Sequence, residues 1–166
     1  MSLLPRVTEQ TRERVARQFD DLGPRSCVQE IIADLRNNNP ELLDMAEKCS
    51  GDVGDPERII VGFCMFYRLL STQSQIGPAE SEREISTLPR VSAQTRELVV
   101  REIDAKGAEA FTVEYIGQLE RDNPELLQMA HNFASRQAQY LRIMQGIALL
   151  WASLVAQLRI DRTYMH

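Results

Sequence analysis

Apolar side chains recur at helical spacing from the beginning of the chain. After Thr8 they fall at Val15, Phe19 and Leu22, and the series stops at Gly23. Steps of three and four residues place such side chains on one face of a helix. A hydroxyl residue can cap the start of that helix, and glycine fits the left-handed conformation that often ends one. A first helix is therefore predicted between Thr8 and Gly23.

Two further helices follow from the next apolar positions. The second is expected to end near Leu35 and carries Val28, Ile31, Ile32 and Leu35. The sequence NPELL then starts a third helix, because Asn39 can act as its N-cap, Pro40 loses no hydrogen bond at the first helical position, and Glu41 favours the positive helix end. We interpret NPELL as a helix start that needs no chemistry of its own.

The fourth predicted helix, about Pro56–Gln73, is apolar nearly all round, which is typical of a helix buried on most sides. One of its stripes consists of Ile59, Phe63, Phe66 and Leu70. Gly62 lies beside this stripe, although a glycine inside a helix costs about 1 kcal/mol relative to alanine. Close approach of another helix backbone would explain that cost.

The same pattern returns 84 positions later without a gap. The sequence from Leu4, LPRVTEQTRERVAR, stands over LPRVSAQTRELVVR from Leu88, and NNPELLDMA at 38–46 stands over DNPELLQMA at 122–130. Gly62 stands over Gly146. A register of this length indicates a tandem internal duplication.

We therefore predict an all-α fold in which two four-helix units form a bundle with pseudo-two-fold symmetry. The first unit spans residues 1–76 and the second spans 88–166, with residues 77–87 as a linker that contains the turn Gly77-Pro78. The fourth helices, 56–73 and 140–157, should meet near Gly62 and Gly146. Both units should share one core, because a unit of this size is marginally stable alone.

The composition narrows the class of protein. A hydrophobic content of 43% with 26% charged residues is typical of a globular chain. The net charge of −5 argues against a protein that neutralises many phosphates. The acidic excess lies in residues 1–84, with 15 acidic and 10 basic side chains, whereas residues 85–166 carry 9 of each.

Membrane association is not expected from the sequence. The chain does not begin with the charged, apolar and small-residue regions of a signal sequence. Its most apolar run, residues 143–158, is short for a bilayer span and carries Gln145, Ser153 and Gln157. We expect this run to be a buried bundle helix and the protein to be cytoplasmic.

The three cysteines, Cys27, Cys49 and Cys64, have no metal-ligand spacing and form an odd set. Their counterparts 84 positions later are Phe111, Phe133 and Ala148. Positions that accept phenylalanine or alanine are apolar packing sites, where a free cysteine behaves as a small hydrophobic residue. The cysteines are therefore predicted to be structural.

Signatures of enzymes and cofactor sites are missing from the sequence. His131 and His166 are the only histidines, too few for a histidine-based metal cluster or catalytic triad. His131 corresponds to Glu47 and is expected at an exposed helix position. The glycines are scattered singly, so a phosphate-binding loop is not indicated. We expect no catalytic residue, no metal site and no cofactor, and an enzyme is unsupported.

A DNA-binding regulator is the third alternative for the function. The second predicted helix, a turn at Asn37–Asn39 and the third predicted helix have the lengths of a helix-turn-helix. A recognition helix should present hydrogen-bond donors to base edges from its first turn. Here that turn is acidic and then apolar, so nucleic acid is not the expected partner. The basic residues that could oppose this conclusion are Arg6, Arg12, Arg14 and Arg17.

One polar pattern repeats without change in both first helices, and we call these eight residues the polar face. They are Gln10, Glu13, Arg17 and Asp20, with Gln94, Glu97, Arg101 and Asp104. A recent duplication with a weak Glu–Arg pair at i,i+4 would account for the identity. The alternative is a surface that binds a partner, and we predict the polar face as the partner-binding site. Separately, Arg58 and Arg142 are expected to pair with the acid of the third helix in their own copy, Glu41 or Glu125.

The leading interpretation is a non-enzymatic helical binding or regulatory protein that engages a protein partner. The first alternative is a helical bundle that holds a small apolar ligand between its halves. Its pocket would be lined by Phe63, Phe66, Tyr67, Tyr115, Tyr140 and Trp151, which could equally fill the core. Self-association into a homo-oligomer stays open, and the sequence does not encode the identity of the partner.

Overall fold

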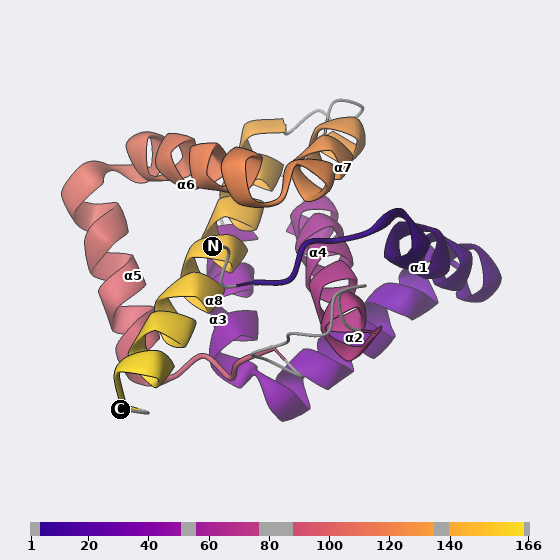
Figure 1. The fold of residues 1–166 in the computed structure, drawn as a ribbon, viewed down its shortest axis with the longest axis horizontal. Coiled ribbons are helices and arrows are strands. Elements are labelled where there is room, and N and C mark those ends of the chain that lie inside the picture. The colour runs from indigo at the N-terminus through magenta and orange to yellow at the C-terminus, as the bar shows by residue number, and fades with distance from the viewer. Residues whose placement is uncertain (1–3, 51–55, 77–87, 135–139, 165–166) are drawn as a thin grey trace.

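The computed structural model describes residues 4–50, 56–76, 88–134 and 140–164, which contain eight α-helices and no strand (Figure 1). The predicted all-helical class is confirmed, whereas the predicted linker at 77–87 lies outside the described residues. The first four helices are α1 (Glu9–Leu22), α2 (Pro24–Asn38), α3 (Pro40–Ser50) and α4 (Pro56–Ile76). The last four are α5 (Ala93–Lys106), α6 (Ala108–Asp122), α7 (Pro124–Ala134) and α8 (Tyr140–Tyr164).

Local signals set the ends of the first helices. The side chains of Thr8 and Ser92 accept a hydrogen bond from the backbone N–H three residues later and cap α1 and α5. Gly23 ends α1 with φ of 82°, and Gly107 ends α5 with φ of 90°. Side chains other than glycine rarely adopt such angles, so these positions set where α2 and α6 begin.

The fourth helices are longer than the sequence analysis predicts. They end at Ile76 and Tyr164 instead of at Gln73 and Gln157. Neither glycine nor proline follows Gln157, so nothing in the sequence stops α8 there. The added turns of α8 are anchored by Leu158, which is buried, and by a 2.9 Å hydrogen bond from Gln157 Nε2 to Asp161 Oδ1.

The buried apolar side chains form one cluster with members from both halves of the chain. In this cluster, α8 of the second half packs against both α4 and α3 of the first half. Phe63 and Phe66 of α4 are fully buried, as are Ile143 and Trp151 of α8. Gly62 and Gly146 are buried as well. That the two helices cross close to these glycines stays a prediction.

The helix α8 carries the longest apolar stretch of the described residues. By length and composition alone, residues 140–163 could cross a membrane, and their most apolar 18-residue window has a mean hydropathy of 1.5. In the structure, 78% of the most apolar window of this helix is buried against the rest of the protein. Such burial is typical of the central helix of a bundle.

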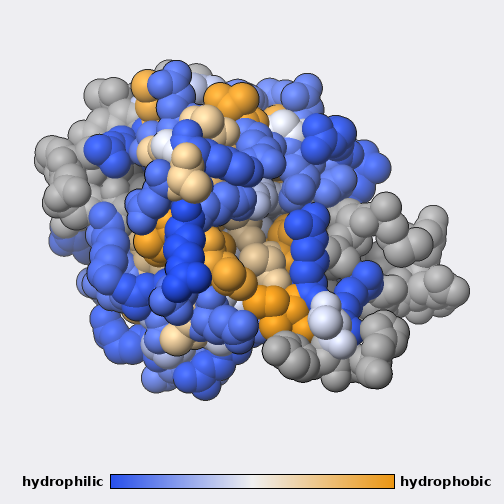
Figure 2. All heavy atoms as spheres, turned by 90° about the vertical axis from the view of Figure 1, so that its left-hand side faces the viewer, coloured by the Kyte–Doolittle hydropathy of each residue, from blue (hydrophilic) through white to orange (hydrophobic). Residues whose placement is uncertain are grey.

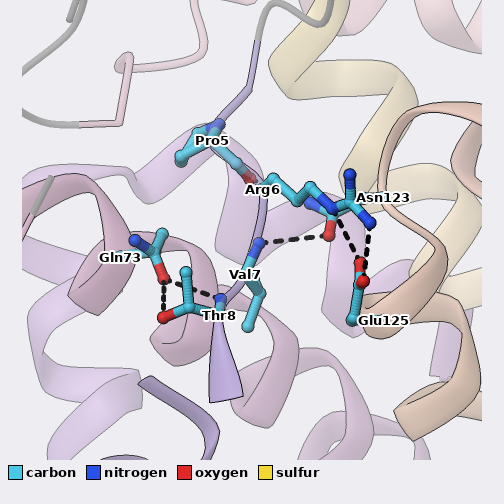
Figure 3. Close-up of polar contacts among 7 residues, drawn as sticks. All are labelled: Pro5, Arg6, Val7, Thr8, Gln73, Asn123 and Glu125. Carbon is cyan, nitrogen blue, oxygen red and sulfur yellow. Dashed lines mark hydrogen bonds and ion pairs between the residues drawn. The ribbon is translucent and has the colours of Figure 1, made fainter. Parts of the chain in front are cut away.

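The segment that precedes α1 reaches across to the second half of the chain (Figure 3). Asn123 accepts a hydrogen bond from Val7 N at 3.1 Å through Oδ1, and its Nδ2 donates to Pro5 O at 2.8 Å. Next to it, Arg6 donates from Nε and Nη2 to the two carboxylate oxygens of Glu125, at 2.9 and 2.6 Å. These bonds lower the pKa of Glu125 below its usual value.

The segment that precedes α5 makes the same backbone contacts with the first half. Asn39 Oδ1 accepts from Val91 N at 2.9 Å, and Asn39 Nδ2 donates to Pro89 O at 2.9 Å. We call these two sets of bonds the asparagine clamps. Helix α3 starts where NPELL predicts, but the side chain of Asn39 clamps the other half of the chain, so the prediction that NPELL is only a helix start is incomplete.

A buried glutamine then fixes each first helix to the fourth helix of its own half. Gln73 Oε1 accepts from Thr8 N at 2.9 Å and from the Thr8 hydroxyl (Figure 3). It also accepts from the hydroxyl of Thr11. Gln157 Oε1 accepts from Ser92 N at 2.9 Å and from the hydroxyl of Thr95. Each half therefore combines a glutamine contact within itself with an asparagine clamp to its partner half.

The Asn123 clamp should contribute strongly to stability. In Asn123→Ala, the buried N–H of Val7 and the carbonyl of Pro5 lose their partners, so we expect the free energy of unfolding to fall by about 1–3 kcal/mol. Urea denaturation followed by far-UV circular dichroism measures this loss. The matched control is Asn37→Ala, because Asn37 is exposed on α2. Equal denaturation midpoints for the two variants would contradict the clamp.

Candidate functional site

A cleft of about 860 Å³ lies between α3, α5, α6 and α8. Figure 2 faces the side of the molecule where α5 lies and shows apolar side chains in a hollow between hydrophilic ones. The lining comprises Glu41, Met45 and Lys48 of α3; Ala93, Arg96, Glu97, Val100, Ile103 and Asp104 of α5; Ala108, Phe111 and Thr112 of α6; and Arg142, Gln145 and Leu149 of α8. One wall thus comes from the first half of the chain and three come from the second.

The α3 and α5 walls are held together at their N-terminal ends. The Asn39 clamp ties the start of α3 to the residues just before α5. One turn into each helix, Arg96 bridges Glu41 at 3.0 Å and Asp44 at 2.6 Å. The Arg96 side chain is only 25% exposed, so solvent screens these ion pairs less than it would at an open surface.

The floor of the cleft is apolar, with Met45, Ile103, Phe111 and Leu149 contributed by four different helices. Phe111 packs against Tyr115, with ring centroids 4.7 Å apart. The hydroxyl of Tyr115 donates to Glu102 Oε1 at 2.6 Å, which ties α6 to α5. Burial, and then this contact with a carboxylate, raises the pKa of Tyr115 above its usual value, so the hydroxyl keeps the proton that it donates.

The α8 wall carries two polar side chains one helical turn apart, Arg142 and Gln145, and both are half-buried. Within the part of the chain that the structure describes, neither makes a hydrogen bond or an ion pair. The expected pair of Arg142 with Glu125 does not form, because Glu125 binds Arg6, and Glu41 of the first half binds Arg96. The prediction for Arg142 is therefore wrong, because the third-helix acids pair across the halves. The side chain of Arg58 lies outside the described residues.

The eight residues of the polar face are all exposed, but they do not form one surface. Those of α1 are Gln10, Glu13, Arg17 and Asp20, and those of α5 are Gln94, Glu97, Arg101 and Asp104. The helices α1 and α5 lie on opposite sides of the molecule in Figure 1. Glu97 and Asp104 line the cleft, and Glu97 pairs with Arg101 at 3.3 Å on the outer side of α5. Partner binding by this face stays a prediction.

The aromatic residues of the expected ligand pocket lie elsewhere. Phe63, Phe66, Tyr67 and Trp151 are buried in the core, and Tyr115 and Tyr140 are half-buried. Trp151 Nε1 donates to Gln118 Oε1 at 3.0 Å, which satisfies its one donor. None of the six lines the cleft. Glu97 and Asp104 of the predicted polar face do line it, but sequence reasoning missed Arg96 and Gln145, which carry no motif.

The remaining candidate chemical groups have packing roles. Cys27 and Cys64 are buried free thiols, and burial raises the pKa of Cys64 to about 12, so it stays protonated at neutral pH. The side chain of Cys49 and all of His166 lie outside the described residues. His131 is half-buried, not exposed as predicted, because Tyr140 packs beside it with its hydroxyl 2.8 Å from His131 Nδ1. Among the described residues, His, Cys, Asp and Glu side chains do not gather into a group that could hold a metal ion.

The start of α3 is not shaped for reading DNA. Leu42 and Leu43 are buried in the core, and Glu41 is bound to Arg96. A recognition helix needs an accessible first turn with hydrogen-bond donors.

Comparison with protein families, curated proteins and solved structures finds no match to this chain.

Arg96 should stabilise the cleft walls more than a surface ion pair does. In Arg96→Gln, the carboxylates of Glu41 and Asp44 lose their shared cation, and we expect unfolding free energy to fall by about 1 kcal/mol. Arg101→Gln on the same helix is the control, because its pair with Glu97 is exposed and such i,i+4 pairs contribute about 0.3–0.5 kcal/mol. Urea denaturation compares the two variants. A larger loss in Arg101→Gln would show that Arg96 does not hold the walls.

Proposed function

We propose that the chain is a tandem duplication of a four-helix unit and that the two units are related by an approximate two-fold axis. The support is the pairing of equivalent residues: the clamp of Asn39 recurs at Asn123, and the contact of Gln73 recurs at Gln157. The asparagine of each unit binds the backbone before the first helix of the other unit, so the two units make the same contact with each other. Such reciprocity is a property of isologous interfaces between identical subunits.

The two units are expected to depend on each other for folding. Residues 88–166 expressed alone lack the partner of Asn123 and the first-half members of the core, so the fragment should unfold or self-associate. Adding residues 1–76 should restore helicity and give a single 1:1 complex of the two fragments. Circular dichroism and analytical ultracentrifugation measure both results. A stable, folded monomer of residues 88–166 would argue against interdependent units.

We further propose that this protein is a non-enzymatic helical binding protein whose cleft accepts an apolar helical segment of a protein partner. The observation that carries this proposal is the open cleft of about 860 Å³, with an apolar floor and walls formed by helices. Val100 lines it and is 43% exposed, and Leu98 on the same helix is 45% exposed. Exposed apolar surface rimmed by polar residues is characteristic of interaction sites. Amphipathic helices commonly bind in grooves of this kind.

The polar face would then act through its α5 members. Glu97 and Asp104 stand at the rim of the cleft, where charges mainly govern the rate and specificity of encounter. The α1 members lie away from the cleft and would serve only a partner that contacts a second site. A small apolar ligand is the alternative occupant, since the cleft volume falls within the range of about 300–1,000 Å³ typical of ligand pockets.

A displayed library of amphipathic helical peptides, with leucine at every third or fourth position, tests this function. The wild-type protein should enrich a consensus peptide. Val100→Glu should weaken binding of that peptide at least about tenfold, because it places a charge on the apolar lining. Val113→Glu is the matched control: Val113 is 68% exposed on α6 and does not line the cleft.

The two valine variants should unfold at the same midpoint as wild type, since both side chains are exposed. Peptides that bind wild type and Val100→Glu equally well would place the interaction outside the cleft. Failure to enrich any peptide, together with binding of small apolar compounds, would favour the alternative occupant.

A further inference from the structure

Of the three basic residues that line the cleft, Arg142 has no counter-charge among the residues that the structure describes. Of the other two, Arg96 is bound by Glu41 and Asp44, and Lys48 lies 3.5 Å from Asp44. Arg142 is half-buried in the α8 wall and, among the described residues, makes no ion pair or hydrogen bond. A guanidinium is always charged and has five N–H donors. Among the described residues, no carboxylate or carbonyl group accepts from those of Arg142.

The acidic residues of the lining do not satisfy Arg142. Glu41 is bound to Arg96, and Glu97 is bound to Arg101. Asp104 is exposed to solvent on α5 and forms no ion pair with Arg142. One turn along α8 from Arg142, the amide of Gln145 also faces the cleft without a partner in the described part of the chain.

We infer that the segment accepted by the cleft presents a carboxylate to Arg142. This inference rests on the proposed function and specifies the chemistry of the partner: an amphipathic helix whose apolar side chains cover the floor and whose flank carries an Asp or Glu. The planar guanidinium binds a carboxylate through two parallel hydrogen bonds, which gives geometric specificity as well as attraction. Gln145 donates or accepts one further hydrogen bond beside that pair.

The combination of Arg142 with Gln145 occurs only in the second half of the sequence. The positions that correspond to Arg142 and Gln145 in the first half are Arg58 and Val61. The amide is thus replaced by an apolar side chain in the other copy, although the arginine is repeated. Valine at position 61 is half-buried in α4, so Gln145→Val substitutes a side chain that the same helix already accepts in the first half.

The test uses the peptide library described for the cleft, with flanking positions that vary among Ala, Gln, Glu and Lys. Selecting peptides that bind wild type should enrich Glu at one flanking position. Selecting peptides that bind Arg142→Glu should enrich Lys at that same position. Replacing the selected Glu by Gln should weaken binding to wild type about tenfold but leave binding to Arg142→Gln unchanged. Gln145→Val should weaken binding of the Glu peptide by a smaller factor while the thermal midpoint stays that of wild type.

The outcomes separate this inference from the proposed function. If peptides bind wild type and lose affinity for Val100→Glu but show no preference for an acid, the cleft is a docking site and the role of Arg142 is wrong. If no peptide is enriched, the proposed function and this inference both fail. If dodecanoate binds with a dependence on Arg142 while no peptide does, the carboxylate belongs to a lipid-like ligand and the helical partner is wrong.

Discussion

The structure depends on two buried asparagine side chains that join the halves of the chain. The backbone around Pro5–Val7 and Pro89–Val91 lies against the opposite half and outside any helix, with the N–H groups of Val7 and Val91 buried there. Buried backbone groups must find partners. A primary amide can donate and accept at once, so Asn123 and Asn39 each satisfy both groups. The position of α5 beside α3, and with it the cleft, follows from the Asn39 clamp and from the Arg96 ion pairs that extend it.

Much of the fold was predictable because its determinants are local. The hydroxyl cap at Thr8, the positive φ at Gly23 and the proline at position 40 act within one turn of the chain, and the helices begin and end there. The periodicity of apolar residues likewise identified the members of the core, including Phe63, Phe66 and Ile143. The extra turns of α8 were missed because no glycine or proline after Gln157 marks where the helix ends.

The site was less predictable, for a reason specific to repeated sequences. When two copies share one register, a contact within a copy and the same contact across copies have identical sequence signatures. The expected pairs of Arg142 with Glu125 and of Arg58 with Glu41 assumed the first kind of contact. In the structure, both acids make contacts between the halves: Glu125 pairs with Arg6, and Glu41 pairs with Arg96. The lining of the cleft depends on that choice, so it could not be derived from periodicity or spacing.

Two halves of similar sequence in one polypeptide have a consequence for how this protein can change. In a dimer of identical chains every substitution appears at both ends, so a half-buried charge without a partner would destabilise the assembly twice. Here the two ends are encoded separately. Position 145 is glutamine while its counterpart, position 61, is valine, and Arg96 is held by two carboxylates while Arg12 keeps a buried Nε without a hydrogen bond among the described residues. Under the proposed function, one end can therefore specialise in recognition while the other preserves the scaffold.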